Sequence, residues 1–307
     1  MRHSAICPAV SILILTACLA PFAQSTKSFW NSPDAYLGQK RPSDVPEIFA
    51  PGMLADSGTF VMGRTAFSLD GREFYYTQGD SWNSLEHARI KMIRYAGRRW
   101  EKPVTISEQF VSPTLSMDNN TLYVRRGNMH NVWQSHRTAD GWSAATPFLD
   151  KPYGLYDFMP TKSGRFYIGS NPDEEDVKNG STLVFSTLTL SSDGVASVKS
   201  LGRPLNRAGF NGDLFVAPDE SYLIISTNET KTFESELYIS FRNSDSTWAA
   251  PVSLGSKIND GLAHRWGQYV TPDGKYLFYT KGTSEKDCAV YWVRFDKLLA
   301  KLRSNGS

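Results

Sequence analysis

The sequence has few cysteines and little excess of either charge. It contains three cysteines in 307 residues, and Cys7 and Cys18 both fall near the N-terminus, which leaves Cys288 as the only thiol of the remaining chain. A single thiol cannot form an internal disulfide or a cysteine-based zinc site. The 33 basic and 31 acidic residues nearly balance. A net charge of +2 therefore gives no indication of the basic footprint that is typical of nucleic-acid binding.

Several enzyme motifs are also missing. The sequence contains no Gly-x-Ser-x-Gly, no phosphate-binding loop and no dinucleotide fingerprint. These absences argue against serine hydrolases with that motif and against nucleotide enzymes. None of the histidines has the spacing of a helical zinc motif: His87, His130, His136 and His264. We accordingly predict neither a metal site nor a cofactor.

The N-terminus has the pattern of an export signal. An apolar run over residues 5–20 follows an early cation and is too short for a comfortable membrane span. Residues 1–25 are predicted to be a signal peptide with small residues before the cleavage point. Alternatively, Leu15-Thr16-Ala17-Cys18 resembles a bacterial lipobox, in which Cys18 would be lipidated. We expect an exported protein that is either a lipoprotein of the periplasm or outer membrane, or a secreted chain. Contact with a membrane is expected only through the lipid anchor.

Aromatic residues, by contrast, are abundant. The chain has 8 Trp, 14 Tyr and 17 Phe, together with 23 Gly and 16 Pro. Aromatic segments punctuated by Gly and Pro are typical of many short strands.

One short sequence motif occurs five times, at intervals of about fifty residues. The copies begin SLDGREFYY at Ser68, SMDNNTLYV at Ser116, TKSGRFYIG at Thr161, APDESYLII at Ala217 and TPDGKYLFY at Thr271. The complete motif predicts a hairpin, because Asp caps a tight turn and Gly closes it in a left-handed conformation before an aromatic strand. A period of about fifty residues matches the blade of a propeller.

Further strands follow each hairpin, but the last repeat lacks its fourth strand. After AVYWVRF the chain continues into a predicted short amphipathic helix over residues 296–303. The segment PEIFAPGML from Pro46 has the pattern of the missing strand, and such closure removes exposed sheet edges. We predict an all-β fold with a single five-bladed β-propeller, or alternatively six blades, over residues 46–303. An N-terminal arm (26–45) precedes it and a tail (304–307) follows.

These repeats resemble the TolB-type family of WD-like β-propeller repeats, whose signature is a Ser/Ala-Pro-Asp-Gly turn followed by an aromatic strand. The resemblance extends from Pro46 to Phe295 and is clearest in LFVAPDESYLIIST and TPDGKYLFYT. The first three repeats lack the Pro, and the turns of the second and fourth repeats lack the Gly. The resemblance implies an exported propeller that presents a surface to partners. It carries over no catalytic residue.

Candidate site residues come from the start of each inner strand, near the mouth of the central channel. The repeats align on five hairpin anchors: Asp70, Asp118, Ser163, Asp219 and Asp273. Counting six residues back from each anchor gives Arg64, Ser112, Asp157, Asp213 and Gly267. Asp157 and Asp213 could form a carboxylate pair for acid–base work on a sugar, with Arg64 opposite. Alternatively, both acids hydrogen-bond the backbone of neighbouring strands or face water, and because Asp is common in such loops this alternative is the one we favour.

A second candidate is the cluster His264-Arg265-Trp266 at a strand entrance. Its composition is that of a binding hot spot and also that of a well-packed blade junction.

The leading functional expectation is a non-enzymatic propeller of the cell envelope that binds an envelope or extracellular protein, or another ligand. The alternative is a carbohydrate-active enzyme of the glycosidase type, or a glycan-binding propeller, that uses the carboxylates at the channel mouth. No nucleic-acid partner is expected. The absence of a catalytic motif favours binding over catalysis.

Overall fold

The computed structural model describes residues 28–82, 84–126, 132–149, 156–170, 184–194, 196–206, 212–227 and 234–305. The predicted signal peptide (1–25), with the lipidation candidate Cys18, lies outside these ranges, as does His130. Residues 306–307 of the predicted tail also lie outside them.

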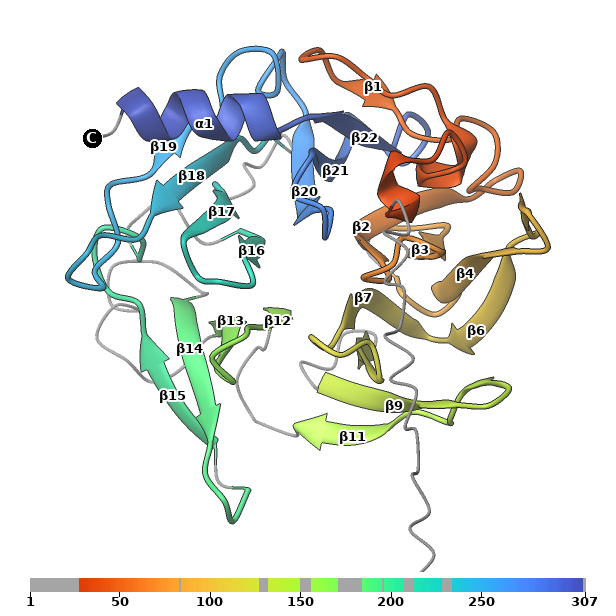
Figure 1. Ribbon diagram of the computed structural model, residues 1–307, viewed down its shortest axis with the longest axis horizontal. Coiled ribbons are helices and arrows are strands. Elements are labelled where there is room, and N and C mark those ends of the chain that lie inside the picture. The colour runs from red at the N-terminus through yellow and green to blue at the C-terminus, as the bar shows by residue number, and fades with distance from the viewer. Residues whose placement is uncertain are drawn as a thin grey trace, which may run out of the picture.

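Five antiparallel sheets form a ring around a central axis (Figure 1). The strands nearest the axis are β2 (Phe60–Phe67), β7 (Phe110–Leu115), β12 (Tyr156–Pro160), β16 (Leu214–Val216) and β20 (His264–Val270). We number the sheets Blade 1 to Blade 5 in that order. The prediction of a five-bladed β-propeller is confirmed, and the six-bladed alternative does not apply.

Each blade continues outward from its inner strand. Blade 1 adds β3 (Glu73–Gly79), β4 (Arg89–Ala96), β5 (Arg99–Trp100) and β6 (Val104–Glu108), and Blade 2 adds β8 (Thr121–Arg126), β9 (Val132–Thr138), β10 (Gly141–Trp142) and β11 (Thr146–Leu149). Blade 3 adds β13 (Phe166–Ser170), β14 (Val184–Leu190) and β15 (Ala196–Ser200), and Blade 4 adds β17 (Tyr222–Ser226), β18 (Leu237–Phe241) and β19 (Val252–Ser253). Blade 5 adds β21 (Tyr276–Gly282) and β22 (Ala289–Arg294).

The N-terminal segment completes the ring, as predicted. Strand β1 (Glu47–Ile48) pairs antiparallel with β22, with Glu47 opposite Trp292, and so supplies the fourth strand of Blade 5. The chain preceding β1 forms two short 3-10 helices, η1 (Phe29–Asn31) and η2 (Tyr36–Gly38). Tyr36 is fully buried and donates a hydrogen bond to Asp273 in the last hairpin turn. Closure by an N-terminal strand joins the two ends of the chain within one blade.

The C-terminal helix α1 (Asp296–Asn305) follows β22 directly and lies beside β18 and β19 (Figure 1). Its apolar residues Leu298, Leu299 and Leu302 pack against the main core. In the described part of the chain, no helix has the length and apolarity that a transmembrane segment needs.

The repeated hairpin turn has the chemistry expected from the sequence. In Blade 1, Ser68 Oγ donates to Asp70, and the residue that closes the turn, Gly71, has φ +76°. Where the repeat lacks Gly, another residue takes the left-handed conformation: Asn119 has φ +60° and Glu220 has φ +59°. The turn therefore survives the loss of its glycine, with the strain that positive φ imposes on a side chain.

The inner strands of four blades carry a β-bulge. In Blades 2, 3 and 5 two residues oppose one on the next strand, and the first of the two has positive φ: Ser112, Asp157 and Gly267. Blade 1 has one residue more, because residues 63–65 all oppose Tyr76. A bulge redirects the side chains beside it, and in Blade 1 the extra residue is Arg64, next to the left-handed Gly63.

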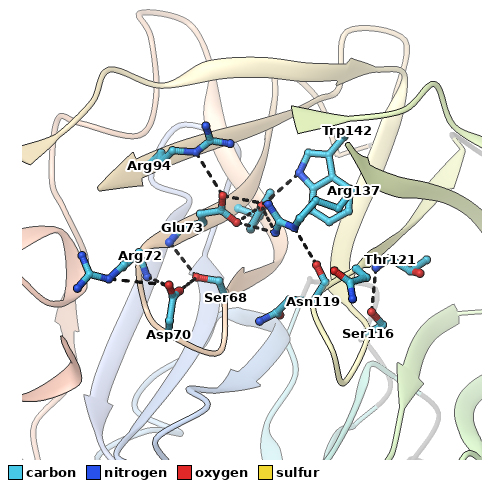
Figure 2. Close-up of polar contacts among 12 residues, drawn as sticks. Ser68, Asp70, Arg72, Glu73, Arg94, Ser116, Asn119, Thr121, Arg137 and Trp142 are labelled. Carbon is cyan, nitrogen blue, oxygen red and sulfur yellow. Dashed lines mark hydrogen bonds and ion pairs between the residues drawn. The ribbon is translucent and has the colours of Figure 1, made fainter. Parts of the chain in front are cut away.

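Blades 1 and 2 are joined by a buried ion-pair cluster centred on Glu73 (Figure 2). Arg137 donates to both carboxylate oxygens, at 3.2 and 2.7 Å, and Tyr75 Oη donates at 2.6 Å. Arg137 also lies over the ring of Trp142, whose Nε1 donates to Tyr75. Burial raises the pKa of Glu73, but hydrogen bonds from Arg137 and Tyr75 outweigh it, so the pKa lies below its usual value. Glu73 therefore stays ionised within the junction.

Blades 3 and 4 have a similar cluster around Glu220. This carboxylate accepts hydrogen bonds from Ser163, Arg165, Tyr167 and Arg242. Burial works against ionisation, yet these bonds lower the pKa of Glu220 to about 2. The ring of Trp248 packs edge-on against Tyr167, as Trp142 does against Tyr75. Alternate junctions thus use the same Arg–Trp–Tyr arrangement around one acid.

Glu73→Gln is expected to lower the free energy of unfolding by about 2 kcal/mol, because it leaves Arg137 with a neutral acceptor in a mostly buried place. Urea denaturation at pH 7 measures this. Glu101→Gln is the control, since Glu101 is exposed. An equal and small effect of the two changes would show that the Glu73 cluster does not stabilise the junction.

Candidate functional site

Arg64 lies at the centre of the channel, where Blades 1, 2, 3 and 4 meet. Its side chain is 1% exposed. One terminal nitrogen donates to Asp157 Oδ1 at 2.8 Å and to the Leu214 carbonyl at 2.5 Å, and the other approaches Thr114 Oγ1 at 3.5 Å. Its Nε has no hydrogen-bond partner among the described residues. The guanidinium therefore spans the axis of the propeller and keeps one buried N–H unused.

Asp157 uses both of its carboxylate oxygens within the protein. Oδ1 pairs with Arg64, and Oδ2 accepts the backbone N–H of Leu214 at 2.9 Å. The residue is 2% exposed and sits at the bulge with φ +47°. A carboxylate that is buried, paired and hydrogen-bonded is not free to take a proton from a substrate. Its position ties Blade 3 to Blades 1 and 4.

Asp213 lies beside this pair but is held differently. Oδ2 accepts the Gly267 N–H at 2.6 Å, its carbonyl accepts Gln268 Nε2 at 2.6 Å, and its own N–H donates to Ser226 Oγ. The side chain is half-buried. Burial and the nearby charge of Asp157, against the opposing charge of Arg64, raise the pKa of Asp213 to about 7. Sequence reasoning placed Arg64, Asp157 and Asp213 around the channel, and the structure brings all three together.

The raised pKa of Asp213 makes stability fall as the pH rises. Below the unfolded value of 3.8, both states hold the proton. Between that value and about 7, the unfolded state loses the proton while the folded state keeps it, so the folded state is progressively disfavoured. Over this range, wild type should lose about 2 kcal/mol of stability relative to Asp213→Asn, in urea unfolding at pH 4.5, 6 and 8.

Asp245→Asn is the matched control for this pH effect. Asp245 is exposed, and the hydrogen bonds from Thr247 lower its pKa. A stability difference between wild type and Asp213→Asn that does not change with pH would contradict the raised pKa.

The cluster His264-Arg265-Trp266 occupies the entrance end of β20. The His264 and Trp266 rings stack with centroids 3.9 Å apart, and Trp82 of Blade 1 meets both edge-on. Burial lowers the pKa of His264 to about 4, so the ring is neutral at pH 7.

Arg265 in the same cluster is used in hydrogen bonds to the loop that precedes β20 and to Ser235. It is 1% exposed and donates to the carbonyls of Ile258, Ser235 and Ala263 and to Asp260. These bonds organise the crossing from Blade 4 to Blade 5 and leave the guanidinium turned away from solvent.

A cavity of about 650 Å³ opens at the opposite end of the channel, where the inner strands enter their hairpin turns. We call it the hairpin-face cavity. All five blades and α1 line it, with Arg64 among the lining residues. Its wall is mostly apolar and includes Phe67, Leu115, Met159, Phe215 and Tyr269. Its size is within the range of small-molecule sites, about 300–1,000 Å³.

Sequence reasoning missed this cavity, although the repeat contained a signal for it. The residues three and four positions before each hairpin anchor line the cavity in every blade: Ala66 and Phe67, Thr114 and Leu115, Met159 and Pro160, Phe215 and Val216, Tyr269 and Val270. Equivalent positions of a repeat face the same way around a closed ring. The alignment of the repeats could therefore have predicted an apolar ring at this end.

Among the described residues, no group of three or more His, Cys, Asp and Glu side chains is arranged to hold a metal ion. The one described cysteine, Cys288, is buried against Val61.

No protein-family model matches the chain, and no curated protein matches it. Solved structures with a similar fold include TolB from Acinetobacter baumannii (10% identity, TM-score 0.45, 76% of this chain and 54% of that one). Others are Kuenenia stuttgartiensis hydrazine synthase (14%, 0.40, 78% and 66%) and a puromycin hydrolase mutant in complex with PGG (14%, 0.42, 72% and 33%). The chain spans between about a third and two thirds of these proteins. Likeness at this level carries no functional argument, and the fold defines the class of the chain as a five-bladed β-propeller.

Proposed function

We propose that the chain is an exported β-propeller of the cell envelope that binds a ligand or a protein partner without transforming it. The observation that carries this proposal is the Arg64–Asp157 ion pair at the channel centre. Because Asp157 is engaged by Arg64, it is not available as one of the two carboxylates that a catalytic pair would need. Binding at the hairpin-face cavity, by contrast, needs only the shape and the apolar wall that the five blades provide.

The sequence supports the envelope location. The apolar run before residue 25 and the lipobox-like Leu15-Thr16-Ala17-Cys18 predict export. The repeated turn motifs resemble those of TolB-type repeats, and this resemblance supports a propeller that presents a surface to partners. Mass analysis of the N-terminus from the native host would distinguish a lipidated Cys18 from a chain beginning at Thr26.

A carbohydrate-active enzyme is the second candidate, and one observation favours it. Asp213 is half-buried beside Asp157, and a carboxyl whose pKa is about 7 could donate a proton at neutral pH. The site offers no second free carboxylate beside Asp213, because one oxygen of Asp157 pairs with Arg64 and the other accepts the Leu214 N–H. Glycosidases ordinarily need two carboxyl groups that can act on the substrate.

One experiment separates the two candidates. The full chain, purified from the envelope of its host, is assayed for hydrolysis of a broad glycoside panel and for saturable binding of components of an envelope extract. We expect no turnover and at least one saturable component. Turnover that Asp213→Asn abolishes without unfolding the protein would overturn the proposal. Absence of any saturable component would also count against it.

A further inference from the structure

The hairpin-face cavity combines a buried apolar wall with charged residues at its mouth. The wall includes Phe67, Met159 and Phe215, all of which are buried. A ligand gains free energy when such a wall takes its apolar surface out of water. The charged lining residues at the mouth then decide which head group the ligand can carry.

Four charged residues line the cavity, and three of them can act on a ligand. Arg64 is 1% exposed and forms its ion pair with Asp157 within the protein, so its charge is already balanced. The other three are exposed and therefore lie where the cavity meets solvent: Lys162, Asp219 and Arg303. Two cations and one acid leave the mouth with one net positive charge.

These three charges lie close together, where the turns of Blades 3 and 4 meet α1. Burial raises the pKa of Asp219, but hydrogen bonds from Ser221 and the charge of Lys162 outweigh it, so Asp219 is ionised and near Lys162. Burial also raises the pKa of Tyr222; Asp219 adds to this rise, and Arg303 of α1 opposes it. Asp219 and Arg303 therefore both act on the same phenol of Blade 4, which itself lines the cavity.

The acids of three other hairpin turns do not offset the positive charge at the mouth. None of them is among the described residues that line the cavity, and each accepts a hydrogen bond from the first residue of its own turn motif: Asp70, Asp118 and Asp273. The interaction between charges weakens with distance and with salt. The lining residues therefore dominate, and they favour a ligand with a single negative charge.

We propose that the hairpin-face cavity binds an amphipathic carboxylate, whose hydrocarbon body enters the cavity and whose single carboxylate stays at the mouth beside Lys162 and Arg303. An uncharged molecule of the same shape would gain from the wall alone. A cation would meet two like charges and one opposite charge, and a second negative charge would meet Asp219. This inference rests on the proposed function, because it names the class of ligand that the propeller holds.

Three compounds with the same ten-carbon chain test this class: decanoate, decylammonium and 1-decanol. Their affinities for the full chain are measured by titration calorimetry at pH 7 and low salt, below the concentration at which they form micelles. We expect decanoate to bind at least tenfold more tightly than decylammonium. The factor of ten corresponds to about 1.4 kcal/mol, which is a reasonable size for charge interactions near a protein surface.

Two matched variants locate the ligand. Leu69 lines the cavity and is 50% exposed, so Leu69→Trp narrows the mouth without disturbing the core. Leu262 is 73% exposed and lies before β20, toward the other end of the channel, so Leu262→Trp is its control. We expect Leu69→Trp to weaken decanoate at least tenfold and Leu262→Trp to leave it unchanged.

A double variant tests the cations at the mouth. Lys162→Gln/Arg303→Gln should weaken decanoate about tenfold and leave 1-decanol unchanged, because only the charged head group loses its partners. The matched control is Lys102→Gln/Arg99→Gln, which removes an exposed lysine and an exposed arginine of Blade 1 that do not line the cavity. This control should keep the affinity of all three compounds.

Asp219→Asn tests the acid in the opposite direction. The asparagine oxygen can still accept the hydrogen bonds that Ser221 donates to Asp219 Oδ1. The preference for decanoate over decylammonium should rise by about tenfold, since the repulsion of the carboxylate and the attraction of the ammonium are both removed.

Absence of decanoate binding, equal affinity for decanoate and decylammonium, or full binding to Leu69→Trp would overturn the inference. So would a Lys162→Gln/Arg303→Gln variant that keeps the wild-type preference. These results are independent of the glycoside panel and the extract. A saturable envelope component without a preference for decanoate would overturn the ligand class and leave the proposed function in place.

Discussion

Replacing Arg64 by Met is expected to lower the free energy of unfolding by about 3–5 kcal/mol, as is typical when one partner of a buried pair is removed. The loss has a specific cause. Asp157 is 2% exposed and pairs with Arg64 at 2.8 Å, so the variant leaves a buried carboxylate whose remaining hydrogen-bond donor among the described residues is the Leu214 N–H. Guanidinium chloride denaturation at pH 7 measures the effect.

The double variant Arg64→Met/Asp157→Asn separates charge from packing. Asparagine can still accept the Leu214 N–H through its side-chain oxygen but has no charge to leave uncompensated. We expect the double variant to be more stable than Arg64→Met alone. If the single change costs less than about 1 kcal/mol, the ion pair does not hold the blades together at the axis.

Gly267→Ala is expected to destabilise the ring by about 3 kcal/mol or more, through the junction of Blades 5 and 1. Gly267 has φ +63°, and a Cβ there would lie 2.3 Å from the Gly63 carbonyl carbon and 2.6 Å from the Arg64 nitrogen. Both neighbours are backbone atoms, so neither can move without shifting β2. The same shift would displace Arg64 from Asp157.

Gly274→Ala is the matched control for this prediction. Gly274 has a similar φ of +72°, but a Cβ there would meet nothing within 4 Å. The control therefore measures the cost of positive φ alone, about 1–2 kcal/mol. Equal losses in the two variants, in urea titrations under the same conditions, would show that the close approach of β20 to β2 is not what requires glycine at position 267.

The architecture could be predicted because its signals are local. A turn such as Thr271-Pro-Asp-Gly specifies a hairpin by its own side chains, and its recurrence every fifty residues specifies a blade. The last repeat lacks a fourth strand, and the segment after Pro46 has the pattern of a strand, so the sequence predicts that this segment completes Blade 5. Strand β1 pairs with β22 as expected. Three of the positions that residue counting singled out, Ser112, Asp157 and Gly267, prove to be left-handed bulge residues, a conformation that the sequence motifs did not predict.

The chemistry at the centre could not be predicted in the same way. The extra residue in the Blade 1 bulge moves the left-handed position to Gly63 and makes Arg64 the residue after it. Arg64 and Asp157 are 93 residues apart, so their pairing depends on how separate blades close around the axis. For the cluster that includes Arg265, the sequence left a binding hot spot and a packed blade junction both open, and only the structure shows that the donors of Arg265 are used within its own loop.

The hairpin-face cavity lies between these cases, because its signal is present in the aligned repeats and absent from any single strand. Phe67, Phe215 and Tyr269 are apolar residues in strands, and each alone is indistinguishable from a residue packed between blades. Only ring closure turns equivalent positions toward one shared space.

The most direct test of the account is the binding of the saturable envelope component to Leu69→Trp and Leu262→Trp. The account predicts that Leu69→Trp, folded to the same stability as wild type, loses the component at least tenfold in affinity. Leu262→Trp should retain it fully, and neither protein should convert it. Undiminished binding to Leu69→Trp, or chemical conversion of the component by wild type, would contradict a propeller that binds without catalysis at its hairpin-face cavity.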